Sequence, residues 1–196
     1  MPIITIDGNI GSGKTSILQK LQMNYGQLVD LEPIEQWKSY LDNIYLNDTG
    51  HFSFQKKVWE DRALIQSRNN NIIFVERSAK FTRETFVEVY KNKFTNEEYL
   101  SLNHLYENSD AKNNKMITEP ILYIYISVSD DICINRINER NRNNEIDINH
   151  ELIKKLNIKH EECYNLLLNQ GYQILKIDGT NSLEDICNEI LRYINN

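Results

Sequence analysis

The 196-residue sequence has few cysteines, no long apolar run and no excess of basic residues. Its three cysteines, Cys133, Cys163 and Cys187, are odd in number and lack the paired spacing of a metal site, so we expect free thiols in a reducing compartment. No apolar run approaches the length of a membrane span. With 22 Lys and Arg against 28 Asp and Glu, the net charge is −6, which argues against a general surface for nucleic acid or acidic membranes. An anionic ligand must therefore be held by a local cluster of basic groups.

The sequence also lacks an internal repeat and an interdomain linker. The first expected strand begins at Ile3, which leaves no room for a signal or transit peptide. We therefore expect one domain over residues 1–196, large enough for a full core without disulfides, in a cytoplasmic protein.

The stretch Asp7–Thr15 organises the chain. Gly8 and Gly13 are separated by four residues and are followed by Lys and Thr, which is the P-loop pattern. Glycines allow successive backbone N–H groups to point at phosphate oxygens, and the positive end of the following helix favours the same anion. In this pattern the lysine reaches the outer phosphates of ATP and the threonine hydroxyl holds Mg²⁺. The candidate ATP-binding residues of the loop are Gly8, Asn9, Ile10, Gly11, Ser12, Gly13, Lys14 and Thr15.

Strands and helices alternate along the sequence. Apolar runs predict strands over residues 3–6, 27–31, 72–75, 121–128 and 172–177. Helical spacing or composition predicts helices after Lys14 and over residues 34–46, 52–68, 83–91, 96–111, 130–142 and 149–169, with a last helix capped by Ser182. This alternation predicts an α/β fold with a five-stranded parallel sheet that carries helices on both faces.

Acidic and basic residues follow the expected strands, at the edge where open α/β sheets bind ligands. Glu32 lies just past the second strand, because Pro33 cannot continue a β-ladder. Glu76 and Arg77 end the third strand. Taken singly, such charges can be chain-end residues of no consequence.

A cluster of arginines follows the fourth strand. Arg136 and Arg140 are four residues apart and share a helix face, and Arg142 and Glu145 come soon after. Several arginines in an acidic chain suit the charge of a transferring phosphoryl group. The alternative is a solvated helix face with ordinary ion pairs.

Together these motifs resemble the deoxynucleoside kinase family, which includes deoxycytidine, deoxyguanosine and deoxyadenosine kinases and mitochondrial-type thymidine kinase. The matches run in order from residue 3 to about residue 165. The resemblance implies a P-loop kinase fold with an Arg-rich lid over about residues 136–146, and transfer of the γ-phosphoryl group of ATP to the 5′-hydroxyl of a deoxyribonucleoside in nucleotide salvage. The matching stretches are 7–15, 32–37, Phe54-Gln55, 76–78 with Arg83 and Phe86, Arg136 to Glu145, and Leu156 with His160 and Glu161.

The resemblance also implies roles for single residues. Glu32 would be the general base for the 5′-hydroxyl, and Arg77 would hold Glu32 and the reacting oxygen in place. Thr15 and Glu76 would attend to Mg²⁺. The lid over the ATP phosphates would consist of Arg136, Arg140 and Arg142, and the loop near adenine of Thr180, Asn181 and Ser182.

For the nucleoside, Tyr45 and Glu145 would bind the sugar 3′-hydroxyl and Gln55 the base edge. Trp37, Val58 and Phe86 would form an apolar slot around the base. The alternative for Trp37 and Phe86 is simple core packing.

Base preference stays open. Arg62 lies seven residues after Gln55 and matches members that read cytosine or purines with an Arg–Asp pair, but Thr82 stands where the aspartate would be. A buried guanidinium without a partner is costly, so we expect Asp61 or Glu84 to pair with Arg62, or else Arg62 to turn to solvent. We favour the first arrangement, which suits bases with polar edges.

The resemblance further implies a homodimer, because relatives pair through two helices after the third strand. The apolar positions available for this are Phe86, Val89, Tyr90, Leu100, Leu102 and Leu105.

One alternative function is a thymidylate-type nucleoside monophosphate kinase, which would carry Asp-Arg on the third strand and basic residues for the acceptor phosphate. A second is a catalytically silent accessory subunit, which should have lost its lysine, its base or its lid arginines. A switch GTPase would need an Asn-Lys-x-Asp motif, which the sequence lacks.

Overall fold

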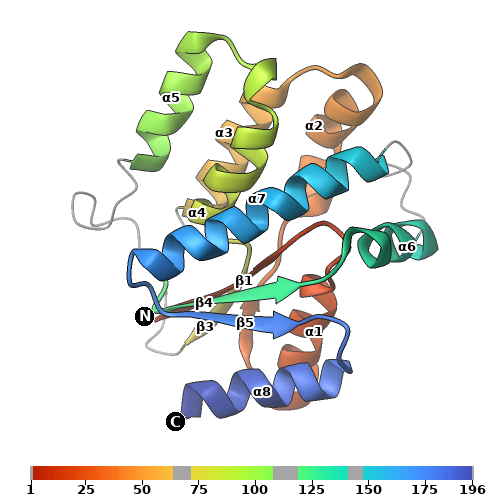
Figure 1. The fold of residues 1–196 in the computed structure, drawn as a ribbon, viewed down its shortest axis with the longest axis vertical. Helices are drawn as coiled ribbons and strands as arrows, with labels where there is room; N and C mark the ends of the chain where they lie inside the picture. Colours follow the sequence, from red (N-terminus) through yellow and green to blue (C-terminus); the bar gives the residue numbers. More distant parts are fainter. Residues whose placement is uncertain (1, 64–71, 108–118, 141–147, 196) are drawn as a thin grey trace.

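The structure is a computed structural model that describes residues 2–63, 72–107, 119–140 and 148–195 (Figure 1). One five-stranded sheet has the order β2-β3-β1-β4-β5, and every neighbouring pair is parallel. The predicted parallel α/β sheet is therefore confirmed. The strands are β1 (Ile3–Gly8), β2 (Leu28–Asp30), β3 (Ile73–Glu76), β4 (Leu122–Ser127) and β5 (Ile174–Asp178).

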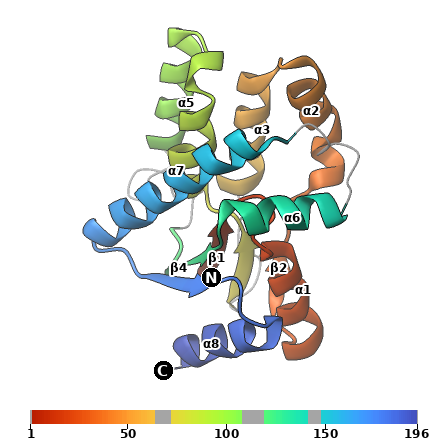
Figure 2. The same ribbon diagram turned by 45° about the vertical axis from the view of Figure 1, so that its right-hand side comes forward.

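Helices cover both faces of this sheet (Figures 1 and 2). α1 (Lys14–Tyr25) and α8 (Leu183–Asn195) pack together on one face. α4 (Ala79–Thr82) and α7 (His150–Asn169) lie on the other face. Beyond α4 lie α2 (Ile34–Asn47), α3 (His51–Ala63) and α5 (Asn96–Glu107), which pack through α3, while α6 (Asp130–Arg140) follows β4 and packs against α7.

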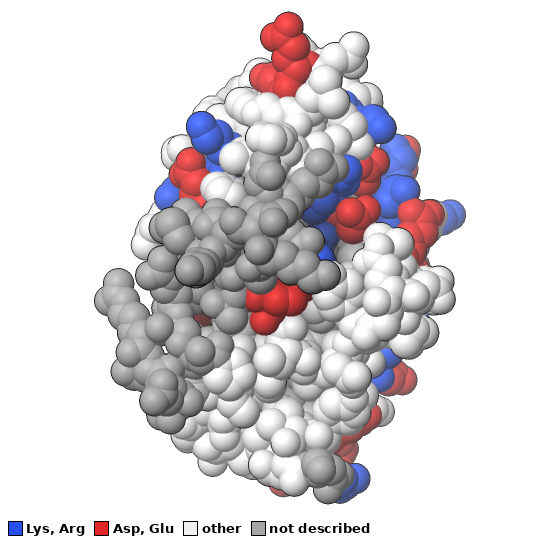
Figure 3. Space-filling model, turned by 90° about the vertical axis from the view of Figure 1, so that its left-hand side faces the viewer, with Lys and Arg blue, Asp and Glu red and all other residues white. Residues whose placement is uncertain are grey.

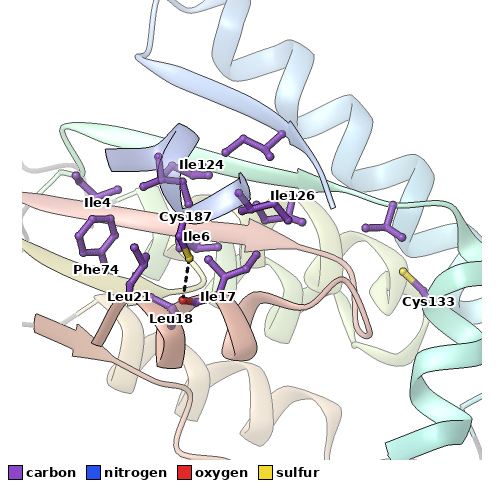
Figure 4. Packing of buried hydrophobic residues seen from close by; sticks show 14 of the residues in the cluster. Ile4, Ile6, Ile17, Leu18, Leu21, Phe74, Ile124, Ile126, Cys133 and Cys187 are labelled. Atoms are coloured by element: carbon purple, nitrogen blue, oxygen red, sulfur yellow. Dashed lines mark hydrogen bonds between the residues drawn. The ribbon is translucent and has the colours of Figure 1, made fainter. Parts of the chain in front are cut away.

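The strands sort their side chains between two cores with a period of two residues. Ile4 and Ile6 of β1 pack in the core on the α1 and α8 face, shown in Figure 4. Tyr123 and Tyr125 of β4 pack on the opposite face in a second cluster with Phe81 of α4. The same alternation puts Asp7 of β1 on the α4 side of the sheet, below the P-loop.

The predicted helix over residues 83–91 is irregular. A π-helix, η1 (Arg83–Val87), continues α4, and a 3₁₀-helix, η2 (Lys91–Lys93), follows it. The hydroxyls of Thr82 and Thr85 donate to the carbonyls of Ser78 and Phe81, each four residues earlier, at 2.9 and 2.6 Å. Such bonds compete with the regular helical ladder, and π-turns often lie at functional sites.

Other predicted boundaries differ by small amounts. β5 starts two residues later than predicted, because Gly171 takes a left-handed conformation and the N–H of Tyr172 still bonds to the carbonyl of Leu167. Asn149 and Ser182 accept capping hydrogen bonds at the starts of α7 and α8. The predicted helical residues 64–68, 108–111 and 141–142 lie outside the described part of the chain.

The cysteines, the helices and the charged side chains can each be compared with the expectations from composition. All three cysteines are free and buried, as predicted. No helix within the described ranges combines the length and the apolar character that crossing a bilayer requires. On the face shown in Figure 3, Lys and Arg side chains lie interspersed with Asp and Glu.

Candidate active site

The P-loop lies between β1 and α1, as the sequence predicts. Gly11 has φ of 81°, and a Cβ there would lie 2.5 Å from the carbonyl oxygen of Cys133, so only glycine fits. The Nζ atom of Lys14 donates to the carbonyls of Gly8 and Asn9 at 3.1 and 2.9 Å. Burial, and secondarily the charge of Arg77, lower the pKa of Lys14 to about 8. The loop is thus closed around a buried amine that an incoming phosphate would stabilise in its charged form.

Two side-chain bridges hold the P-loop. The Nδ2 atom of Asn9 donates to the carbonyl of Ile153 at 2.9 Å and to Oδ1 of Asn157 at 3.0 Å, both on α7. Arg136 donates from Nη1 to the carbonyl of Ser12 at 3.2 Å and from Nη2 to that of Gly179 at 2.9 Å. Arg136 thus connects the P-loop to the turn between β5 and α8. Asn157 is a contact that the sequence reasoning missed.

Glu32 and Arg77 form an ion pair at the carboxyl edge of the sheet. Nε of Arg77 lies 2.6 Å from Oε1 of Glu32, and its Nη1 donates to the carbonyl of Gly8 at 3.3 Å. Burial opposes the ionised form of Glu32, but the charges of Arg77 and Lys14 outweigh it and hold the pKa of Glu32 below its ordinary value. Arg77 has φ of 65°, a left-handed conformation that costs a non-glycine residue about 1–2 kcal/mol. The predicted meeting of these two residues is seen directly.

Thr15 and Glu76 also meet, as expected. The Thr15 hydroxyl donates to Oε1 of Glu76 at 2.7 Å, and Oε2 of Glu76 accepts from the backbone N–H of Glu32 at 3.2 Å. Burial and the neighbouring charge of Glu32 raise the pKa of Glu76. A cation bound beside Glu76 would offset the negative charge of Glu32 and favour the ionised form of Glu76. A hydroxyl and a carboxylate are oxygen donors of the kind that Mg²⁺ takes together with substrate phosphates, so this pair fits a magnesium ion.

A cavity of about 320 Å³ joins the P-loop to a largely apolar pocket between α2, α3 and η1. Most of the predicted residues share it. The predicted residues that line it are Ile10, Gly11, Gly13, Lys14, Thr15, Glu32, Trp37, Tyr45, Gln55, Val58, Glu76, Arg77, Thr82, Phe86 and Arg140.

The inner end of the cavity has apolar walls and few polar groups. Trp37 packs edge-on against Phe54 with ring centroids 5.7 Å apart, and Arg77 lies 4.5 Å from the centroid of Phe86. Trp37 is therefore both a core residue and a wall of the cavity. Oε1 of Gln55 is buried with no hydrogen-bond partner among the described residues, while the Thr82 hydroxyl is committed as a donor to Ser78. An unpaired buried acceptor is what a ligand N–H group would satisfy.

Arg62 is arranged differently from both predicted alternatives. It is buried, and its Nη1 lies 2.8 Å from Oδ1 of Asp30, at the end of β2. The expected partner Asp61 instead accepts from Trp37 Nε1 at 2.7 Å and from Lys57 at 2.9 Å. Arg62 is not among the residues that line the cavity. The predicted partner was wrong, because the carboxylate of Asp30 at the end of β2 lies within ion-pair distance of Arg62, whereas Asp61 is bonded to Trp37 and Lys57.

Several residues predicted for the ATP site, the lid or the dimer interface lie elsewhere than expected or outside the described part of the chain. Thr180, Asn181 and Ser182 lie on the turn before α8 and do not line the cavity, and Arg142 and Glu145 lie outside the described residues. Of the positions expected at a dimer interface, Leu102 is fully buried within the chain, and Tyr90 lines the cavity together with Phe86. The cavity is also lined by Ser16, Gln19, Ile34, Leu41, Ile44, Phe54 and Tyr90. Ile34 and Phe54 lie in stretches that match the family, and Tyr90 was expected at a dimer interface instead. For Leu41 and Ile44 the apolar spacing within α2 was the only signal.

Known proteins share this fold and sequence pattern. Protein 143R of Invertebrate iridescent virus 6, which is named as a kinase, is 29% identical over 203 residues, covering 100% of this chain and 98% of its own. A structure of deoxyadenosine kinase from M. mycoides with bound dCTP has a TM-score of 0.80 and 26% identity, covering 98% of each chain. Another structure of that enzyme, with dCMP and dCDP, has a TM-score of 0.82 at 23% identity and covers 98% of each chain.

The sequence model of one family, described as deoxynucleoside kinase, matches residues 4–196. This range includes the P-loop, the Glu32–Arg77 pair and the walls of the cavity, so it covers the whole site described above. The chain belongs to the deoxynucleoside kinase family, and it is an ATP-dependent enzyme that transfers a phosphoryl group to the 5′-hydroxyl of a deoxyribonucleoside.

Proposed function

We propose that phosphoryl transfer takes place in the cavity beside the Glu32–Arg77 pair, with the nucleoside in the apolar pocket and the ATP phosphates on the P-loop. The observation that carries this proposal is the single cavity that holds Glu32, Arg77, Lys14 and Thr15 at one end and Gln55 at the other. Its volume of about 320 Å³ is in the range of small-ligand sites.

Glu32 is the proposed general base. Its lowered pKa keeps it ionised at neutral pH, and the bond to Arg77 fixes the orientation of the carboxylate. Since a base of lowered pKa removes a proton weakly, it acts late in the transfer, and most of the rate comes from alignment and charge neutralisation. Arg77 orients both Glu32 and the acceptor oxygen in this proposal.

The phosphate end is proposed to use backbone and basic groups. The loop Gly8–Thr15 supplies N–H groups and Lys14, and Arg140 faces the same cavity. Thr15 and Glu76 would hold Mg²⁺. When bound, the ion neutralises charge on the phosphate oxygens. The remaining proposed ATP contacts are Arg136, Arg142, Thr180, Asn181 and Ser182, within a lid over about residues 136–146 and the turn before α8.

The nucleoside end is proposed to bind the base between Trp37, Val58 and Phe86, with the amide of Gln55 at its polar edge. The buried, unpartnered Oε1 atom of Gln55 supports this placement. Tyr45 and Glu145 are the proposed partners of the sugar. Thr82 offers only acceptor lone pairs, because its proton is shared with the carbonyl of Ser78.

A biological setting is part of the proposal. A cytoplasmic enzyme of nucleotide salvage suits the three free, buried thiols, which a reducing compartment preserves. A homodimer is proposed from family resemblance and from Leu100 on α5, which is 65% exposed. We propose no nucleic-acid or membrane partner, in keeping with the acidic net charge.

The testing experiment supplies labelled ATP, Mg²⁺ and each of the four deoxynucleosides, with the four deoxynucleoside monophosphates as alternative acceptors. We expect 5′-monophosphates from at least one nucleoside, no turnover of monophosphates, and loss of product in Lys14→Met. Product from monophosphates alone would instead indicate a monophosphate kinase. Binding without any turnover would indicate an accessory subunit.

A further inference from the structure

Asp7 connects β1 to the segment that carries Arg77. It is the residue before the first P-loop glycine, and it is fully buried. Its Oδ1 atom accepts two hydrogen bonds from one residue, at 2.7 Å from the backbone N–H of Ser78 and at 3.1 Å from the hydroxyl of Ser78. Charge-assisted bonds of this kind are stronger than neutral ones. Asp7 therefore fixes the position of Ser78 relative to β1.

Ser78 in turn fixes the start of α4. Its hydroxyl accepts from the N–H of Phe81 at 3.1 Å, which caps the helix, and its carbonyl accepts from the Thr82 hydroxyl at 2.9 Å. Both Phe81 and Thr82 are buried. β3 precedes Arg77 in the chain, and Ser78 directly follows it. The Asp7 carboxylate thus fixes the backbone immediately after Arg77.

Arg77 lies between two backbone attachments to β1. Its own N–H donates to the carbonyl of Ile6 at 3.0 Å, and the next N–H, of Ser78, donates to Asp7. Between these bonds the chain turns sharply, which is why Arg77 has φ of 65°. A non-glycine residue holds this conformation only where its surroundings fix it. Without Asp7, the Ser78 N–H would be buried and unpaired, and the turn would be free to relax.

The turn determines where the Arg77 guanidinium lies. From this backbone the Arg77 side chain places Nε 2.6 Å from Oε1 of Glu32 and Nη1 3.3 Å from the carbonyl oxygen of Gly8 in the P-loop. We propose that Asp7 is a positioning residue for phosphoryl transfer, which acts through Ser78 and the left-handed turn to place the Arg77 guanidinium against Glu32. This inference rests on the proposed roles of Glu32 and Arg77.

The test is a double-mutant cycle on kcat with Asp7→Ala and Arg77→Met, measured with saturating ATP and deoxynucleoside. We expect Asp7→Ala alone to lower kcat roughly 10–100-fold, with both KM values changed less than about threefold, because alignment is lost rather than ground-state binding. In the Arg77→Met background the same substitution should cost less than about threefold. Asp7→Asn keeps an oxygen that accepts both Ser78 bonds, and should restore kcat to within about threefold of the wild type.

A purely structural role predicts a different pattern. Asp7→Ala would then lower the melting temperature, but the folded enzyme would keep its kcat, or the loss would be the same with and without Arg77; either result overturns the inference. If Asp7→Ala does not fold, Ser78→Ala goes through the same cycle with the same two outcomes. This variant removes the hydroxyl that donates to Asp7 and accepts from Phe81, but it keeps the Ser78 N–H bond to Asp7. An inactive wild type would reject the proposed function, whereas an active wild type with additive effects rejects only the role of Asp7.

Discussion

The Nε atom of Arg77 donates a 2.6 Å hydrogen bond to Oε1 of Glu32, and both side chains are largely buried. The two residues are 45 positions apart in the sequence and come from the ends of neighbouring strands. The guanidinium offsets the burial of the carboxylate and lowers its pKa. The pair therefore keeps a charged, oriented acceptor at the edge of the ligand cavity.

Replacing Glu32 with Gln should preserve the fold and nucleoside binding, because the amide has nearly the same shape and its oxygen can still accept from Arg77. Without the general base, kcat should fall by roughly 10²–10⁴. Single-turnover phosphorylation measures the chemical step directly. Glu35→Gln, at an exposed position on the first turn of α2, is the matched control and should leave kcat unchanged. A fall of less than about tenfold in Glu32→Gln would show that Glu32 is not the base.

Activity should decline in mild alkali because of Lys14. Burial lowers its pKa to about 8, so above that pH the free protein carries a neutral amine, which attracts phosphate poorly. The ratio kcat/KM for ATP should therefore fall above pH 8, approaching about tenfold per pH unit, and ATP binding at pH 8.5 should take up protons. Calorimetry in two buffers of different ionisation enthalpy measures this uptake.

The control is Lys20→Met, since Lys20 lies on the same helix but near Glu184. It should leave both the pH profile and the proton uptake as they are in the wild type. Proton release on ATP binding, or a profile that is flat to pH 10, would contradict the lowered pKa of Lys14.

The P-loop and the ends of the strands could be predicted from sequence because their chemistry is local. Glycine spacing, Pro33 and the charged residues after apolar strands each specify a position along one short stretch. Since the carboxyl ends of parallel strands lie at one edge, the placing of Glu32 and Arg77 at that edge followed from the fold class, whereas their pairing followed from the family resemblance. The pocket residues that followed from family resemblance, such as Tyr45, Gln55 and Val58, needed that larger pattern.

Contacts between distant elements could not be predicted in the same way. Asp30 pairs with Arg62, and Asp7 holds Ser78, through the packing of β2 and β1 against later elements. No spacing rule within one helix or strand specifies such partners. The π-turn at Arg83–Val87 was missed for a related reason, because its sequence is compatible with an ordinary helix until Thr85 bonds back to Phe81.

If the protein dimerises through α5, Leu100 is the position to change. It is 65% exposed, although a leucine gains free energy from burial. Leu100→Glu should convert a dimer to a monomer in light scattering at micromolar concentration, with the fold retained. Leu46→Glu, at a leucine of α2 that is 64% exposed, is the matched control and should leave the dimer intact. A monomeric wild type would reject the homodimer.

Arg62→Met should affect stability more than base preference. Arg62 lies outside the cavity lining, 2.8 Å from Asp30, and its guanidinium carbon is 6.0 Å from the Trp37 ring centroid. Removing one partner of a buried ion pair typically costs about 3–5 kcal/mol, but the Asp30 side chain is 36% exposed and water can solvate the remaining charge. We therefore expect a loss of about 1–2 kcal/mol in the free energy of unfolding, measured by urea denaturation.

Asp30→Asn is the matched partner variant. It leaves the Arg62 guanidinium, whose side chain is only 5% exposed, without its counter-charge, so it should destabilise the protein more than Arg62→Met does. In both variants the ratio of kcat/KM for thymidine to that for deoxycytidine should stay within about threefold of the wild-type ratio, because neither side chain lines the cavity. A rise of about tenfold or more in Arg62→Met would show instead that Arg62 turns inward to read the base when a nucleoside binds.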